Sequence, residues 1–124
     1  MSTMTNGTSS FNQREVVFTK VPYTNQIGYK IRPALILSRK EYNRNNQDYI
    51  VCYITLKPTK DPYKVKLDNK DLERGKLKAS IIRPGKIFTI LEKDLYKKAA
   101  KVKITKMKEV LEKLNSQIAL DENE

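Results

Sequence analysis

The segment Lys30-Ile31-Arg32-Pro33-Ala34-Leu35-Ile36-Leu37-Ser38 gives the clearest indication of the fold. Its short apolar run, closed by a serine and followed by a polar stretch, predicts a buried strand rather than a helix. Because Pro33 has no N–H to donate to a strand ladder, we expect it at the first position of this strand or on an edge. The segment therefore predicts a β-rich domain.

Arg32 lies directly before this proline. A rigid strand end that presents an arginine, in a very basic protein, is suited to binding phosphate. The alternative is a solvated arginine at an ordinary strand start, and the local pattern alone favours that alternative.

The charge of the chain favours a polyanionic partner. The 124 residues include 25 basic and 14 acidic side chains, and three of the acids fall in the last four residues. Such a body attracts RNA or DNA, although a solubilising charge excess is also possible. We expect no membrane association, because no apolar stretch is long enough to span one and no basic amphipathic helix carries aromatic anchors.

Cys52 is the only cysteine, and the chain has no histidine. These counts exclude an internal disulfide, a Cys/His zinc site and histidine-based nucleophilic catalysis. Cys52 lies in an apolar strand pattern, so we interpret it as a packing residue. No phosphate-binding glycine loop or paired metal-binding carboxylates are present, and we expect no cofactor or metal.

The chain is long enough for one domain. Residues 1–13 carry no charged side chain and are rich in Ser, Thr and Asn. They lack the basic start and apolar run of a signal peptide, so we expect a disordered tail on a cytoplasmic protein. The domain should cover residues 14–118, and residues 119–124 should form an acidic tail.

Short β segments dominate the rest of the pattern. We expect strands at 15–21, 32–38, 48–56, 63–67, 80–83 and 86–91. The dipeptide Pro84-Gly85 indicates either a turn between the last two or a kink within one long strand. Residues 68–75 suggest a charged connection, and residues 92–101 are ambiguous. Thr105 is the expected N-cap of a final helix with an apolar stripe. Together these elements predict a small, strongly bent barrel with a C-terminal helix.

An enzyme without histidine can still act on RNA, because the ribose 2′-OH is itself a nucleophile. The protein must then hold the phosphate in line and neutralise the charge that develops on it. Arginine, with its planar fork of N–H donors, suits this task.

Several segments in this order resemble the PemK/MazF toxin family of bacterial type II toxin–antitoxin systems. They are the Pro-Tyr-Thr-Asn loop from Pro22, the Arg-Pro-Ala-Leu-Ile-Leu-Ser segment from Arg32, Tyr-Ile-Val-Cys-Tyr-Ile-Thr from Tyr49, and Ser-Ile-Ile-Arg-Pro-Gly-Lys-Ile-Phe-Thr from Ser80. The resemblance covers roughly residues 14–118. It implies an SH3-like barrel of about five to seven short, mostly antiparallel strands.

The resemblance also implies a function and partners. It implies a homodimer that binds a cognate antitoxin and cuts single-stranded mRNA as a metal-independent, sequence-selective endoribonuclease. Attack by the 2′-OH would leave a 2′,3′-cyclic phosphate and a 5′-OH.

The site residues follow position by position from the resemblance. In one branch of the family the catalytic pair matches Arg32 and Thr55. In another branch a second catalytic arginine matches Arg83, but the aspartate that follows it two residues later is Gly85 here. The histidine that some members carry in the first loop is absent. The general base is therefore unassigned.

Further side chains are expected to contact RNA through stacking, base edges or phosphate. They are Tyr23, Asn25, Gln26, Lys30, Ser80 and Lys86. Two alternatives remain open. One is a non-catalytic nucleic-acid-binding barrel, or degenerate toxin. The other is a gyrase poison of the same barrel type, but that relative needs a C-terminal tryptophan, which this chain lacks.

Overall fold

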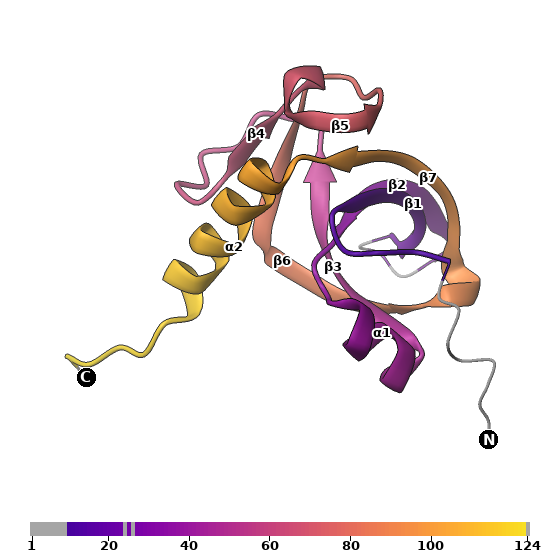
Figure 1. Cartoon of the computed structure of the whole chain (residues 1–124), viewed down its shortest axis with the longest axis horizontal. Helices are drawn as coiled ribbons and strands as arrows, with labels where there is room; N and C mark the ends of the chain where they lie inside the picture. The colour runs from indigo at the N-terminus through magenta and orange to yellow at the C-terminus, as the bar shows by residue number, and fades with distance from the viewer. Residues whose placement is uncertain (1–9, 24, 26, 124) are drawn as a thin grey trace.

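The computed structural model describes residues 10–23, 25 and 27–123 of the chain. Within these residues, seven strands form one curled antiparallel sheet in the order β4-β6-β3-β2-β1-β7-β5 (Figure 1). The strands are β1 (Glu15–Pro22), β2 (Tyr29–Ile36), β3 (Asp48–Thr55), β4 (Val65–Leu67), β5 (Leu72–Gly75), β6 (Ser80–Leu91) and β7 (Leu95–Val102). The helices are α1 (Lys40–Asn46) and α2 (Ile104–Ile118), with 3₁₀ turns η2 (Asn69–Asp71) and η3 (Glu92–Asp94). The prediction of a mainly β, strongly bent domain with a C-terminal helix is confirmed.

Pro33 lies inside β2 rather than at its first position, because the strand begins at Tyr29. On one side β2 pairs with β1, where Pro33 is opposite Phe18. On the other side β3 pairs with β2 only from Ala34 onward. Pro33 therefore lies where β2 is locally an edge strand, and the missing N–H breaks no pairing with β3.

Pro84 and Gly85 mark a kink in one long strand, the second of the two alternatives. Along β3, Cys52 is opposite Ile87 of β6, but the next residue, Tyr53, is opposite Arg83. Residues 84–86 of β6 therefore lie between two adjacent residues of β3. Extra residues of this kind bend a strand and increase its twist, which curls the sheet.

The sequence pattern missed β5 and β7. In β7 only Leu95, Ala100 and Val102 are buried, and the exposed side chains include two lysines, Lys97 and Lys98. β5 contributes one buried residue, Leu72, and lies at the edge of the sheet. β7 lies between β1 and β5. Both strands gain their stability from pairing with neighbours, which leaves little signal in their own residues.

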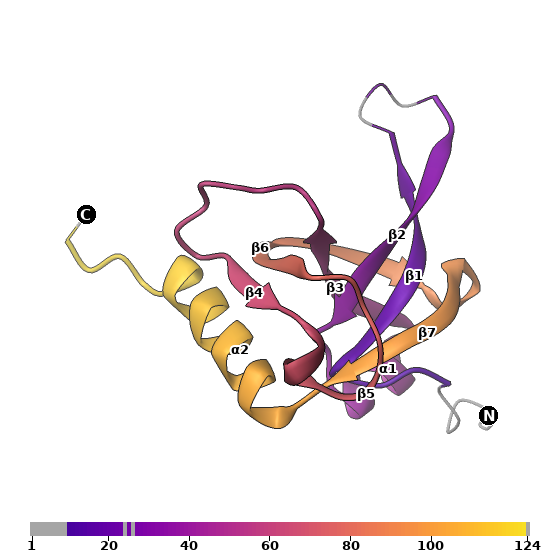
Figure 2. The same cartoon turned by 90° about the horizontal axis from the view of Figure 1, so that it is seen from above.

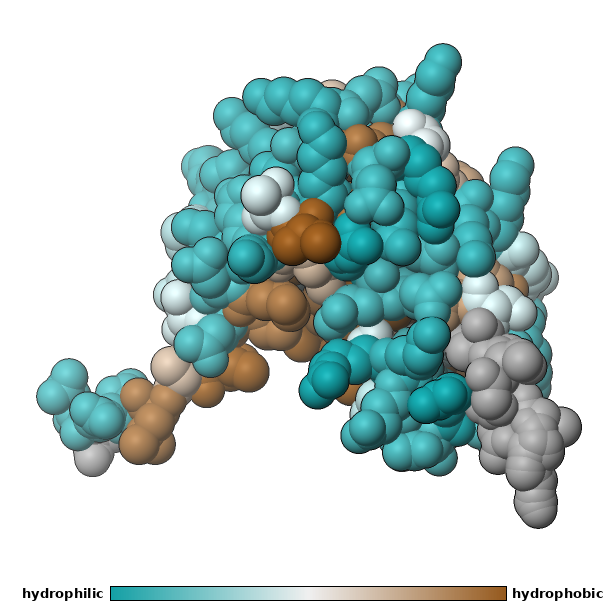
Figure 3. All heavy atoms as spheres, viewed as in Figure 1, coloured by the Kyte–Doolittle hydropathy of each residue, from teal (hydrophilic) through white to brown (hydrophobic). Residues whose placement is uncertain are grey.

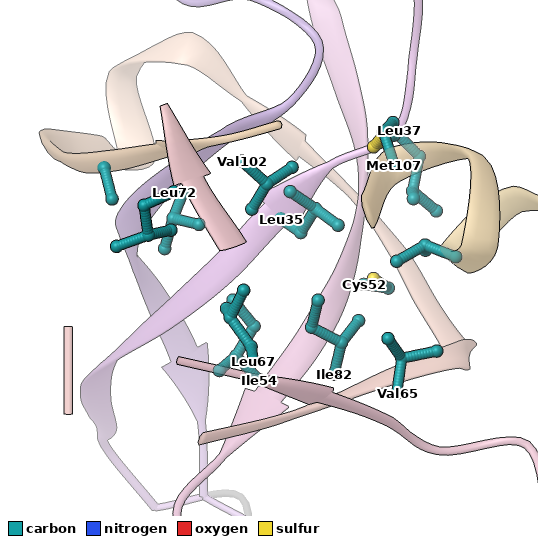
Figure 4. Close-up of a cluster of buried hydrophobic side chains, with 13 residues drawn as sticks. Leu35, Leu37, Cys52, Ile54, Val65, Leu67, Leu72, Ile82, Val102 and Met107 are labelled. Carbon is teal, nitrogen blue, oxygen red and sulfur yellow. The ribbon is translucent and has the colours of Figure 1, made fainter. Parts of the chain in front are cut away.

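The main core lies between the curled sheet and α2. Its side chains come from several strands and from the helix, and those labelled in Figure 4 point toward a common centre. Met107 and Val110 close it from α2. The N-cap of α2 is Lys103 rather than Thr105, because the helix begins at Ile104 and the Met107 N–H donates to the Lys103 carbonyl at 3.0 Å.

Residues 1–9 of the expected N-terminal tail lie outside the described residues. The end of that segment packs on the barrel. The Phe11 ring meets the Tyr49 ring edge-on, with centroids 6.0 Å apart, and Gln13 Nε2 donates to the Leu37 carbonyl at 2.8 Å. Folded contacts therefore begin before residue 14. At the other end, residues 119–123 follow α2 as an exposed segment, and Glu124 is outside the described residues.

We predict that Gly75→Ala destabilises the protein. Gly75 has φ +83°, and a Cβ there would lie 2.4 Å from the Ala99 carbonyl oxygen. The combination of left-handed backbone and clash should cost more than about 2 kcal/mol in the free energy of unfolding. Urea unfolding of the wild-type protein and of each variant measures this free energy, with Gly28→Ala as the control. Gly28 also has positive φ, but its nearest contact is an ordinary 3.6 Å to the Tyr23 ring. Equal losses in the two variants would contradict the clash.

Candidate functional site

The middle of the sheet presents Tyr53 and Arg83 side by side. Residues directly opposite each other in an antiparallel pair point to the same face, and Tyr53 is opposite Arg83. The alternate residues of β3 and β6, Cys52, Ile54 and Ile82, point into the core. Tyr53 and Arg83 therefore lie on the other face of the sheet, which also carries a second buried cluster that includes Ala34 and Val51. There the Tyr53 ring packs against Phe88 with centroids 4.9 Å apart.

Arg32 and Thr55 belong to the same face. The pairing of β2 with β3 ends at Ala34 and Tyr53, and Arg32 and Thr55 each lie two residues beyond this pair in their own strands. Strand alternation therefore points both side chains to the face of Ala34 and Tyr53. Arg32 is exposed, and among the described residues its guanidinium makes no hydrogen bond or ion pair. The register thus brings Arg32, Thr55 and Arg83, which are 23 and 28 residues apart in the sequence, to one face of three neighbouring strands.

Arg83 is held by a carboxylate from the loop between β3 and β4. Asp61 Oδ2 accepts from both Nε and Nη2 of Arg83, each at 3.3 Å. The backbone N–H of Tyr63 lowers the pKa of Asp61 below its ordinary value, burial opposes this, and Arg83 and then Lys86 lower it further. Asp61 is therefore ionised at neutral pH.

Thr55 ends β3 and begins the same loop. Its Oγ1 accepts from the Lys57 backbone N–H at 3.1 Å, which leaves the hydroxyl proton available to donate. Figure 2 shows this β3–β4 loop and the β1–β2 hairpin projecting on the same side of the molecule.

The β1–β2 hairpin carries four of the predicted RNA contacts. Lys30 Nζ lies 5.6 Å from the centre of the exposed Tyr23 ring, and Lys20 Nζ lies 4.1 Å from that of Tyr29. Asn25 Oδ1 accepts from the Ile27 N–H at 3.1 Å and so helps to form the turn. Gln26 lies outside the described residues.

The other two predicted contacts differ in position. Lys86 is exposed in the kink of β6, and its charge acts on Asp61. Ser80 is buried at the start of β6, on the same face as Ile82, and its hydroxyl donates to the Lys78 carbonyl at 2.6 Å. The fold therefore brings Lys86 close to Arg83 but sets Ser80 on the opposite face of the strand.

The described residues include neither a membrane-spanning helix nor a metal-type cluster of side chains. None of their helices has the length and apolar character needed to cross a bilayer. No cluster of three or more Asp, Glu, Cys or His side chains among them has the arrangement of a metal site.

Residues 12–118 match the family model of PemK-like, MazF-like toxins of type II toxin–antitoxin systems. The match covers most of the chain, so the protein belongs to this family. The resemblance inferred from the sequence segments is thereby confirmed. The comparison with curated proteins gave no match.

Solved structures of similar fold include three toxins. An endoribonuclease from Mycobacterial species, in complex with its cognate antitoxin, has a TM-score of 0.73 at 19% identity, covering 90% of this chain and 98% of that one. The MazE–MazF complex (Form-II) from Deinococcus radiodurans has a TM-score of 0.69 at 18% identity, covering 92% and 100%. The Mycobacterium tuberculosis toxin MazF-mt6 has a TM-score of 0.65 at 20% identity, covering 85% and 98%. At these identities the likeness shows the fold.

Sequence reasoning missed two members of this face. Tyr53 could have been found, because it precedes Thr55 by two residues and so shares its side of β3. In the sequence, Asp61 is marked only as a turn residue, because it lies between Pro58 and Pro62 and directly precedes the second of them. Its partner Arg83 is 22 residues away, and only the folded loop brings the two together.

Cys52 takes no part in this chemistry, as the sequence predicted. It is fully buried, and burial raises the pKa of its thiol to about 12. The thiolate is the reactive form, so at pH 8 the native protein should react with maleimide far more slowly than the urea-unfolded chain. Mass spectrometry of the labelled protein checks this, and equal rates in the two states would contradict the burial.

Proposed function

We propose that this toxin is a metal-independent endoribonuclease that cuts single-stranded mRNA at selected sequences. The observation that supports it is the shared face of Arg32, Thr55 and Arg83 on a very basic member of a toxin family. The similar structures named as endoribonucleases agree with this activity. The proposed substrate also makes the cytoplasm the proposed location.

The proposed reaction needs no covalent enzyme intermediate. The ribose 2′-oxygen attacks the adjacent phosphorus, the bond from phosphorus to the 5′-oxygen breaks, and the products are a 2′,3′-cyclic phosphate and a 5′-OH. The 2′-OH loses a proton, and the leaving 5′-oxygen gains one. Arg32 and Arg83 would neutralise the charge on the phosphate oxygens and supply N–H donors. Thr55 would donate its hydroxyl proton to a phosphate oxygen or orient the 2′-OH.

The β1–β2 hairpin is the proposed RNA grip. Its exposed Tyr23 and Tyr29 rings can stack on bases, and Lys20 and Lys30 beside them can reach the backbone phosphates. We propose that Asn25, Gln26, Lys86 and Ser80 add contacts to the RNA, although Ser80 needs a rearrangement to become accessible.

A cognate antitoxin is the proposed protein partner. Two of the similar structures are complexes of a toxin with its antitoxin. The exposed basic and aromatic side chains of this face suit an acidic peptide as well as RNA. An antitoxin that covers the face would therefore block the substrate.

A homodimer through α2 is also proposed. Figure 3 shows apolar atoms gathered along α2 and the segment that follows it. Three exposed apolar residues, Ile104, Leu111 and Ile118, recur at intervals of seven along the helix. In an antiparallel pair of α2 helices centred on Leu111, Ile104 of each copy would face Ile118 of the other. This self-complementary stripe suits a two-fold interface.

Cleavage of a long single-stranded RNA in the presence of EDTA tests the activity. We expect the wild-type protein to cut it, and primer extension with end-group analysis to find 2′,3′-cyclic phosphate and 5′-OH ends. Arg32→Ala should slow cleavage by about 100-fold or more, because it removes a charge-stabilising donor. The control is Arg44→Ala, an exposed arginine on α1. Thr55→Val should also slow cleavage while keeping the strand shape.

Two results would contradict this proposal. If Arg32→Ala cleaves at the wild-type rate, the assigned role is wrong. If the wild-type protein binds RNA in a salt-dependent way but forms no cyclic phosphate, the non-catalytic barrel is the better description.

Leu111→Lys should convert the proposed dimer into a monomer, since it sets two charges against each other at the centre of the stripe. Light scattering after gel filtration measures the mass. Leu120→Lys is the control, because Leu120 is also an exposed leucine, at 83% against 38% for Leu111, but follows the helix. A wild-type monomer, or a Leu111→Lys dimer, would rule out pairing through α2.

A further inference from the structure

We infer that Asp61 is a positioning residue of the ribonuclease site, which fixes the Arg83 guanidinium so that its free edge faces the phosphate. This inference rests on the proposed function. It concerns the contact between the β3–β4 loop and β6, which links two strands of the proposed site.

Asp61 binds one edge of the Arg83 guanidinium and leaves the other edge free. Arginine has five N–H donors in a planar fork. Asp61 Oδ2 takes the Nε proton and one Nη2 proton of Arg83. The two Nη1 protons and the second Nη2 proton remain, and they form the end of the fork that can grip two oxygens of one phosphate. A carboxylate on the Nε side therefore orients the arginine without blocking it.

The carboxylate is itself fixed by the loop. Asp61 Oδ1 accepts from the Tyr63 N–H at 2.9 Å, so each of its oxygens has a defined partner. The Asp61 N–H donates to Thr59 Oγ1 at 3.2 Å, and its carbonyl accepts from the Lys64 N–H at 3.2 Å. Asp61 thus stands on a loop with its own hydrogen bonds, and its side chain is only 12% exposed.

The same loop begins at the other side of the site. Thr55 ends β3 and accepts from the Lys57 N–H. The loop therefore begins at Thr55 and contacts Arg83 through Asp61. Its position couples the orientation of Arg83 to that of the Thr55 hydroxyl.

Position 85, two residues after Arg83, is an exposed glycine and supplies no carboxylate. A Cβ on Gly85 would meet only the end of the Gln117 side chain, with Nε2 at 2.4 Å. Among the described residues, Asp61 is the only acid that forms an ion pair with Arg83.

The test is a double-mutant cycle measured as single-turnover RNA cleavage. Asp61→Asn keeps an oxygen for the Tyr63 N–H but removes the charge that holds Arg83. We expect it to slow cleavage by about 10-fold or more with little change in affinity for a non-cleavable 2′-O-methyl RNA. In an Arg83→Ala background the same substitution should have no further effect.

The matched control is Asp68→Asn. Asp68 also accepts a backbone N–H two residues ahead, that of Lys70 at 3.1 Å, but forms no ion pair with Arg83. Melting temperatures of all variants report folding, and Asp61→Glu, which keeps the charge, should recover part of the rate. A role in stability alone would lower the melting temperature and leave the rate of the folded protein unchanged.

Three outcomes overturn the inference, and they are distinguishable. If Asp61→Asn cleaves at the wild-type rate, this carboxylate has no role in the reaction. If Asp61→Asn slows cleavage equally in the Arg83→Ala background, Asp61 does not act through Arg83. If the wild-type protein cleaves no RNA, the proposed function fails, and this inference fails with it.

Discussion

The pairing of β3 with β6 determines both the shape and the site of this protein. Its register changes between Cys52 and Tyr53, where three residues of β6 have no direct partner. On both sides of this shift the strands pair in regular register, and the added bend curls the sheet around the main core. The shift also decides which residue faces Tyr53. Without this register shift, Arg83 of β6 would not lie opposite Tyr53, near the end of β3.

The core constrains the site through the alternation of the strands. Cys52, Ile54 and Ile82 must point inward to meet α2 and β4, so their neighbours Tyr53, Thr55 and Arg83 must point outward. Loss of the core packing would therefore disorganise the outer face even though no site residue is buried in it. Fold and proposed chemistry depend on the same two strands.

Excess positive charge explains the organisation of the acidic residues. Glu15, almost fully buried, is bound by Arg74 and Lys98, and Asp61 is bound by Arg83. In a chain with 25 basic side chains, these few buried or half-buried carboxylates fix selected cations in place. Arg14 and Lys106 also pair with acids, whereas other basic groups form no ion pair within the described residues and are available to the proposed RNA. Arg32, exposed and without a protein partner among the described residues, is one of them.

By itself, the sequence determined the β-rich class, the central strand at 48–55, the final helix and the residue types of the site. Apolar periodicity is a local property of the sequence, and the absence of histidine and of metal-binding motifs is a property of its composition. It did not reveal β5 or β7, whose many exposed and charged residues become strands only by pairing with neighbours, nor the start of α2. Only the tertiary structure decided that Asp61 holds Arg83 and that Arg32 shares a face of the sheet with Thr55. These contacts depend on register and on loop closure, which no short segment of sequence specifies.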